Sequence, residues 1–147
     1  MTPQDWVLVT LAASEGKSLG PIQLQKTLFI IGKKVPRDSL GEAFFQFVPY
    51  DYGPFCSKIY SDAEDLELLG LIQISRSPAV RYKQYLITDA GKKRALESLA
   101  SLPKNVKKFI QELVPAFSGA SFNQLVEAVY RSYPETKMNS IYREPKQ

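Results

Sequence analysis

Apolar residues at helical spacing predict two helices in the first part of the chain. The first begins at Thr2, which can cap a helix, has a proline in its first turn, and ends at Gly16. The second begins at Pro21, and its apolar residues keep helical spacing as far as Gly32. Both segments therefore read as helices with one apolar face.

The middle of the chain predicts a long insert and then a third helix. Residues 33–41 read as a loop, and residues 42–50 are aromatic and alternate imperfectly, which favours a short strand. Segment 57–69 has an apolar face made of Ile59, Tyr60, Ala63, Leu66 and Leu69. Ser57 can cap this helix, and Gly70 is typical of the position after a helix end.

Alternating apolar residues after the third helix predict a β-hairpin. Residues 71–74 and 80–87 read as its strands, and residues 75–79 read as its turn. Thr88 then caps a further helix that we expect to end near residue 102.

The last part of the chain is predicted to be helical. Residues 103–113 have one apolar face, and Pro115 to Gly119 predict a break. Ser121 then caps a helix that ends before Pro134.

This order of elements predicts an α+β protein that is mainly α. Three helices, a hairpin and a helix are the order of a winged helix-turn-helix, here with about two dozen inserted residues between helices two and three. We expect residues 1–102 to form the winged-helix domain. Residues 103–147 then form a C-terminal helical extension packed on it.

The composition excludes most catalytic chemistries. The 147 residues contain no histidine and a single cysteine, Cys56, which excludes histidine-based triads and zinc sites made of histidine or cysteine. There is no phosphate-binding glycine loop. We therefore expect a protein that is not an enzyme, with no cofactor and no metal site.

The sequence also bears on location. No run of eighteen apolar residues exists, and the N-terminus lacks the pattern of a signal peptide. With one cysteine, a reducing cytoplasm is the expected compartment, without membrane association.

Charge is distributed unevenly along the chain. The net charge is +4, but residues 76–108 hold nine Lys or Arg against two acidic residues. Residues 51–69 hold five acidic residues against one lysine. The basic region favours an anionic partner, whereas the acidic third helix favours a protein partner.

Duplex DNA is the first partner that we expect. The start of the third helix and the hairpin are the parts of a winged helix that meet the grooves and the phosphates. The candidate DNA-binding residues are Ser57, Lys58, Tyr60, Arg76, Arg81 and Lys83.

A protein partner is the alternative, because carboxylates on the third helix would repel phosphate. The candidate protein-binding residues combine an aromatic cluster with this acidic helix. They are Tyr50, Tyr52, Phe55, Asp62 and Asp65.

Two resemblances support these expectations. "DLELLGLIQI", followed by "YLITDAGKKRALESL", resembles the third helix, wing and next helix of winged-helix regulators. "PIQLQKTLFII", "YDYGPF" and "YRSYPETKMNSIYR" are similar to YwgA-like proteins and to Panacea-domain antitoxin proteins. Panacea proteins usually have a tryptophan before the YGP motif, where this chain has Tyr50.

The second resemblance implies a non-catalytic scaffold in a phage-defence or toxin–antitoxin context, where Panacea-type antitoxins act by binding a toxin. The main functional hypothesis is DNA-binding transcriptional regulation. The alternative is an adaptor or antitoxin that neutralises a partner protein such as a toxin or defence component. Assembly into a homodimer is left open.

Overall fold

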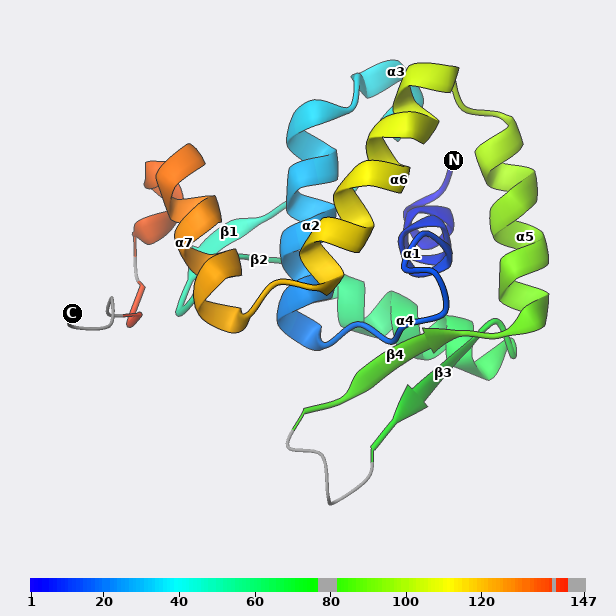
Figure 1. Cartoon of the computed structure of the whole chain (residues 1–147), viewed down its shortest axis with the longest axis horizontal. Helices are drawn as coiled ribbons and strands as arrows, with labels where there is room; N and C mark the ends of the chain where they lie inside the picture. Colours follow the sequence, from blue (N-terminus) through cyan, green and yellow to red (C-terminus); the bar gives the residue numbers. More distant parts are fainter. Residues whose placement is uncertain (77–81, 139, 143–147) are drawn as a thin grey trace.

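The protein is mainly helical, with two small antiparallel sheets (Figure 1). The computed structural model describes residues 1–76, 82–138 and 140–142. Within these residues the helices are α1 (Pro3–Ala12), α2 (Pro21–Lys34), α3 (Arg37–Leu40), α4 (Lys58–Leu68), α5 (Asp89–Ala100), α6 (Lys104–Ser118), α7 (Phe122–Ser132) and the 3-10 turn η1 (Pro134–Lys137). The strands are β1 (Val48–Tyr50), β2 (Gly53–Phe55), β3 (Ile72–Ser75) and β4 (Gln84–Ile87). The mainly α, α+β class is confirmed.

Helix α1 lies at the centre of the elements that pack around it. Thr2 caps it as predicted, since its hydroxyl accepts a hydrogen bond from the Asp5 backbone N–H at 3.1 Å, and the Asp5 carboxylate accepts one from the Thr2 backbone N–H at 2.9 Å. All six residues from Trp6 to Leu11 are buried. This is possible because α1 packs against α2, α4, α5 and β4, which together surround it.

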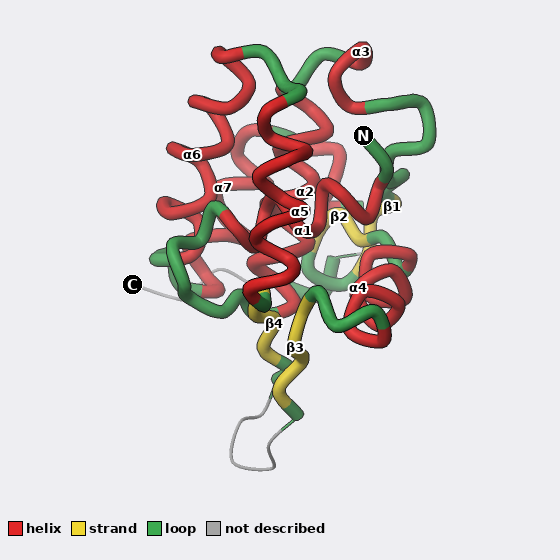
Figure 2. Tube along the Cα trace, turned by 90° about the vertical axis from the view of Figure 1, so that its right-hand side faces the viewer, coloured by secondary structure: helices red, strands yellow, loops and turns green. Residues whose placement is uncertain are grey.

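The join from α4 through the hairpin to α5 follows the prediction. Strands β3 and β4 are antiparallel, with Ile72 opposite Ile87. The Thr88 hydroxyl accepts a hydrogen bond from the Gly91 backbone N–H at 3.1 Å and donates one to the Gly70 carbonyl at 2.7 Å. The hairpin extends from the helical body beside α4 (Figure 2). The predicted turn at residues 75–79 lies partly outside the described residues.

A short bridge attaches the α1–α2 connection to the hairpin. The backbone N–H of Leu19 donates to the Tyr85 carbonyl at 2.9 Å, and the Tyr85 N–H donates to the Leu19 carbonyl at 2.8 Å. Leu19 therefore lies beside β4 as a third strand would, and both residues are buried.

The insert between α2 and α4 differs from the prediction. Helix α2 continues to Lys34, and some of the residues predicted as loop form the short helix α3. Trp6 holds this helix in place, because its Nε1–H donates a hydrogen bond to the Leu40 carbonyl at 2.8 Å. Only the last three residues of the predicted strand at 42–50 are extended as β1, which pairs with β2. The preceding phenylalanines pack against helices instead, for example Phe44 against Trp6 with ring centroids 6.0 Å apart.

The predicted break at Pro115 is wrong, because α6 runs through this proline to Ser118. A proline inside a helix costs about 3 kcal/mol, since it removes a backbone hydrogen bond and crowds the preceding turn. The buried side chains of Val106, Ile110 and Val114 lie on the face of α6, which packs on α2. Burial of this face offsets the cost of the proline.

Helix α2 connects the N-terminal part of the fold to the C-terminal helices. It contacts α1, α6, α7 and β2, and in Figure 1 it lies between α7 on one side and α1 and α6 on the other. Contacts of β1 and β2 with η1, and of β2 with α7, join the insert to the C-terminal helices. None of the helices in the described ranges is long and apolar enough to cross a membrane.

Candidate interaction surface on α4 and the hairpin

The start of α4 offers fewer free groups than the sequence predicts. Ser57 and Lys58 are exposed, but the Ser57 side chain does not cap the helix, because its backbone is already helical. Tyr60 is half-buried, with its ring stacked on Tyr85 at 6.3 Å and edge-on to Phe55 at 5.8 Å. Burial raises the pKa of the Tyr60 hydroxyl to about 12. The Tyr60 ring therefore joins α4 to β4.

Lys58 is neutralised within its own helix. Its ammonium pairs with the Asp62 carboxylate at 2.7 Å, one turn further on, and lies 5.6 Å from the Phe45 ring centroid. Asp62 is only 5% exposed, although the sequence placed it on the solvated, protein-binding side of the helix. Asp62 is thus a buried carboxylate that is paired with a lysine of its own helix.

Carboxylates of α4 also pair with the hairpin cations. Arg76 Nη1 lies 3.0 Å from Glu67 Oε1, while Glu67 Oε2 accepts a hydrogen bond from the Ile74 backbone N–H at 2.7 Å. The Ile74 hydrogen bond, followed by the Arg76 contact, lowers the pKa of Glu67. Lys83 Nζ lies 3.8 Å from Glu64 Oε1. Arg81, the remaining hairpin candidate, lies outside the described residues.

The exposed side of α4 is consequently acidic and apolar. We call Ser61, Glu64, Asp65, Leu68 and Leu69 the α4 face; all five side chains are exposed. Asp65 has no ion-pair partner among the described residues. Leu68 and Leu69 are 87% and 63% exposed. Such a surface attracts basic, partly apolar surfaces and repels phosphates.

The three aromatic candidates lie on the β1–β2 hairpin. Tyr50 is half-exposed and stacks on Phe55 at 5.0 Å, and Tyr52 meets Phe122 of α7 edge-on at 5.1 Å. The carbonyl of Asp51, in the turn between them, accepts hydrogen bonds from the Ile141 N–H at 2.8 Å and the Ser140 hydroxyl at 3.1 Å. These rings thus help attach the C-terminal segment to the insert.

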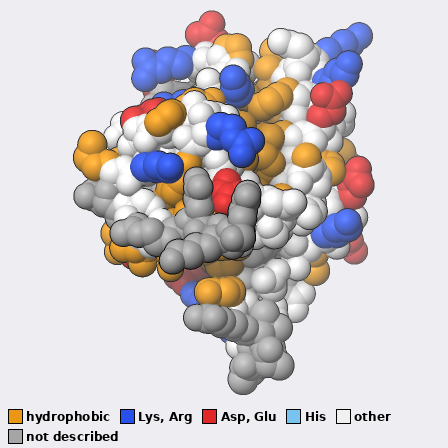
Figure 3. Space-filling model, turned by 60° about the vertical axis from the view of Figure 1, so that its left-hand side comes forward, with side chains coloured by type: hydrophobic (Ala, Val, Ile, Leu, Met, Phe, Trp, Pro, Cys, Tyr) orange, Lys and Arg blue, Asp and Glu red, His pale blue; other side chains and the backbone are white. Residues whose placement is uncertain are grey.

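Further apolar side chains are exposed around this attachment. On the face turned to the viewer in Figure 3, hydrophobic side chains lie at the surface among lysines and arginines. Val48 of β1 is 57% exposed, and Met138 and Ile141 are exposed to a similar degree. Of the candidates for protein binding, the three aromatic residues thus lie on the β1–β2 hairpin, Asp62 is buried on α4, and Asp65 is exposed on α4.

Two buried polar residues of α2 were not predicted. Gln25 donates from Nε2 to the Cys56 carbonyl at 2.8 Å and accepts from the Cys56 N–H at 3.0 Å. Lys26 is 2% exposed, and its ammonium donates to the Pro54 carbonyl at 3.2 Å. Burial lowers the pKa of Lys26 to about 8. Both residues fix the β1–β2 hairpin to α2. Their position among the helically spaced apolar residues of 22–31 is the sequence feature that could have predicted their burial.

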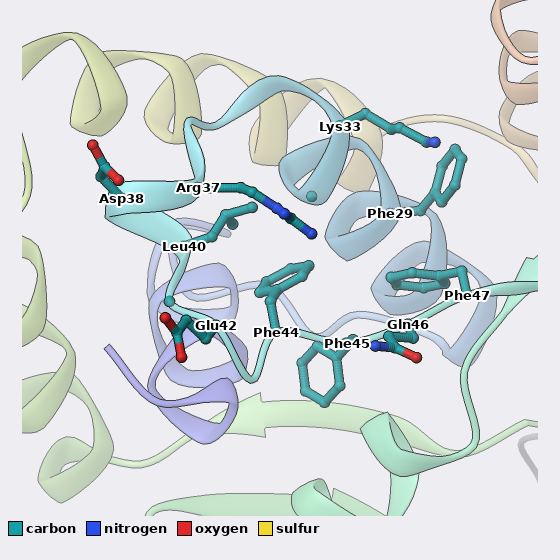
Figure 4. A pocket seen from close by; sticks show the side chains of 12 residues that line it. Phe29, Lys33, Arg37, Asp38, Leu40, Glu42, Phe44, Phe45, Gln46 and Phe47 are labelled. Carbon is teal, nitrogen blue, oxygen red and sulfur yellow. The ribbon is translucent and has the colours of Figure 1, made fainter.

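A cavity of about 780 Å³ lies at the opposite end of the molecule from the hairpin, between α2, α3 and residues 41–47 (Figures 1 and 4). Four phenylalanines and several charged residues line it. No group of three or more His, Cys, Asp or Glu able to hold a metal ion exists in the part of the chain that the structure describes.

In the comparisons with known proteins, no family model matches this chain, and no curated protein matches it either.

Proposed function

We propose that this protein is a non-catalytic winged-helix protein that binds another protein through its α4 face. The winged-helix assignment is supported by the order α1, α2, α4, β3, β4 and α5. The backbone bridge between Leu19 and Tyr85 supports it further, because it adds a third strand position beside the hairpin. The wing is then the β3–β4 hairpin, and α4 is the helix that would enter a DNA groove.

The pairing of cations with α4 carboxylates carries the choice of a protein partner. Lys58, Arg76 and Lys83 each lie within 4.0 Å of a carboxylate of α4. A phosphate that approached Arg76 would have to compete with Glu67. The Glu67 carboxylate would stay in place even then, because the Ile74 N–H also holds it. The repulsion between this carboxylate and the phosphate would offset the attraction to Arg76.

The chemistry of the α4 face indicates the kind of partner. Glu64 and Asp65 favour a basic surface, and complementary charges of this kind increase the rate of association. Leu68 and Leu69 favour an apolar side chain on the partner, since burial of exposed leucines stabilises a complex. The resemblance to Panacea-type antitoxins, which bind toxins, agrees with a basic protein partner in a defence or toxin–antitoxin setting.

Affinity purification from the native host, with quantitative mass spectrometry, tests this proposal. We expect the wild type to retain a partner that the double variant Asp65→Lys/Leu68→Ala loses. The matched control is Glu97→Lys/Leu96→Ala on α5, which makes the same reversal of charge and the same truncation of a leucine at exposed positions away from the α4 face. A partner retained equally by both double variants would contradict the proposal. The purified partner should then bind with an affinity that falls as salt rises.

Binding of duplex DNA is the second candidate, favoured by unpaired lysines on α5 and α6. Lys92, Lys93 and Lys104 are exposed and have no ion-pair partner among the described residues. Fluorescence anisotropy on random-sequence duplex at several salt concentrations distinguishes the two candidates. If DNA is the partner and Lys92 contacts a phosphate, Lys92→Ala should reduce the log–log salt slope by roughly 0.9. The absence of duplex binding at low salt would exclude DNA.

A further inference from the structure

The cavity between α2 and α3 has a floor of aromatic rings. Phe29 comes from α2, and Phe44, Phe45 and Phe47 come from the segment that leads into β1. The rings pack against one another in pairs. The ring centroids of Phe29 and Phe47 lie 5.4 Å apart in an edge-on arrangement, and those of Phe44 and Phe45 also lie 5.4 Å apart. A Cβ on Gly32 would lie 2.8 Å from Phe44, so the glycine lets this ring lie directly on α2. The floor is thus assembled without a ligand.

Two cations lie at the rim of this cavity. Arg37 extends over the rings in Figure 4 and has no ion pair or side-chain hydrogen bond among the described residues. Lys33 Nζ lies 5.5 Å from the Phe29 ring centroid. The carboxylates of Asp38 and Glu42 also belong to the lining, but they point away from the rings. The groups nearest the floor therefore favour an anion.

One wall of the cavity comes from residues 45–47, whose backbone groups have no hydrogen-bond partner in the described part of the chain. Phe45, Gln46 and Phe47 all line the cavity and continue directly into β1. Within the described residues, their backbone N–H and carbonyl groups make no hydrogen bond. Unpaired backbone beside a strand is the element to which an extended peptide can add. A small organic ion would use the cations and rings but would leave this wall unpaired.

We infer that this cavity binds an extended acidic peptide segment of a partner protein, with a large apolar side chain on the phenylalanine floor and a carboxylate on Arg37. This site is separate from the α4 face, because none of the five residues of that face lines the cavity. The protein would then hold partners at two places. A variant that no longer binds a partner at one site can still be tested for binding at the other site.

The only tryptophan provides a reporter for the site. Trp6 contacts Phe44 with its ring, and its Nε1–H donates to the Leu40 carbonyl at 2.8 Å; both partners line the cavity. The experiment is an NMR titration of the full-length ¹⁵N-labelled protein with the capped peptide acetyl-Asp-Phe-Val-Phe-Asp-amide. We expect shifts of the Trp6 indole signal and of the amides of residues 44–47. The same peptide with Lys in place of both Asp should leave these signals unchanged.

Two variants with the same change of charge test the role of Arg37. Arg37→Glu should weaken peptide binding at least about tenfold, because it replaces a charge-assisted hydrogen bond with repulsion. Lys34→Glu is the control, since Lys34 is exposed at the end of α2 and does not line the cavity; its affinity should change less than about twofold. Equal losses in the two variants would overturn the inference by indicating general electrostatic attraction.

Other results would also overturn the inference. Equal binding of the acidic and basic peptides would remove the role of charge. Phenylacetate binding as tightly as the peptide would make this a site for small organic anions, because the backbone wall would contribute nothing. No shift at millimolar peptide would exclude the site. The Asp65→Lys/Leu68→Ala variant should bind the peptide like the wild type, which separates this inference from the function proposed for the α4 face.

Discussion

Glu67 of α4 holds the start of the hairpin through the backbone of Ile74, whose N–H donates to Glu67 Oε2 at 2.7 Å. The second carboxylate oxygen pairs with Arg76 at 3.0 Å, two residues further along the chain. A single side chain thus sets the position of β3 relative to α4 and neutralises a cation of the hairpin. This relationship is one reason why we propose a protein, and not a nucleic acid, as the partner of this surface.

Replacement of Glu67 by glutamine should lower the free energy of unfolding and should make this free energy less dependent on pH. Glu67→Gln keeps one acceptor for the Ile74 N–H but loses the charge that pairs with Arg76, so we expect a loss of about 1 kcal/mol at neutral pH. The pKa of Glu67 is lowered in the folded protein, so its contribution is present at neutral pH and is lost as the pH falls through this lowered pKa. The loss caused by the substitution should therefore disappear in acid.

Urea unfolding of wild type and variant at pH 7 and pH 2 measures this effect. Glu97→Gln is the control, because Glu97 is exposed on α5 and has no ion-pair partner among the described residues. An equal loss at both pH values would show that the Glu67 charge is not involved.

The buried Lys26 should make the protein more stable as the solution becomes alkaline. Its pKa falls from 10.5 to about 8 on folding, so the unfolded chain binds more protons between these values, and the free energy of unfolding rises with pH. From pH 7.5 to 9.5 we expect a rise of about 2 kcal/mol from this residue, since one pKa unit corresponds to about 1.4 kcal/mol. The half-buried Tyr60, whose pKa is raised to about 12, acts in the opposite direction, but only above about pH 10.

Lys26→Met tests this expectation, because methionine has an unbranched chain of similar length and no charge. The variant should unfold with nearly the same free energy at pH 7.5 and pH 9.5. Lys34→Met, at an exposed position of the same helix, should keep the rise of the wild type. A rise that persists in Lys26→Met would assign the pH dependence to another group.

Removal of the Phe47 ring should reduce stability. The ring is half-buried and meets Phe29 edge-on at 5.4 Å, so Phe47→Ala should cost about 2 kcal/mol and lower the melting temperature by several degrees. Val48→Ala is the control, since that side chain is 57% exposed, and it should change little. An unchanged melting temperature in calorimetry of Phe47→Ala would mean that the ring does not support the core.

A methyl group at Gly91 should disrupt the join between the hairpin and α5. An ideal Cβ there would lie 2.0 Å from the Leu71 carbonyl oxygen, which is backbone and cannot move aside as a side chain can. We expect Gly91→Ala to cost more than about 3 kcal/mol in denaturant unfolding. Gly119→Ala, where the nearest atom lies at 3.6 Å, should change stability by less than about 1 kcal/mol. A stable Gly91→Ala variant would require a different path for residue 71.

Features that depend on neighbouring residues were predicted well. Thr88 and Gly91 lie three residues apart, and the cap, the turn at Gly70 and the hairpin follow from local conformational preferences. The mainly α, α+β class follows from such local patterns as well. Because these preferences are local, the sequence placed the hairpin correctly.

Features that depend on distant residues were missed. Trp6 holds α3 across 34 positions, and Phe29 and Phe47 come together from either side of that helix. The helical course through Pro115 depends on burial against α2. Asp62 was expected at the surface, because helical periodicity alone does not show that the side chain is buried and paired with Lys58. The cavity could not be predicted either, because its walls come from segments that only the fold brings together.

The attachment of the β1–β2 turn to the C-terminal segment has a consequence for the order of folding. The Ser140 hydroxyl reaches the Asp51 carbonyl across 89 positions, and the Ile141 N–H reaches the same oxygen. Contacts this distant form late, since the intervening chain must be ordered first. A chain growing on the ribosome can assemble α1, α2, α4, the hairpin and α5 early. Its aromatic turn at residues 50–53 must wait until the last helices have emerged.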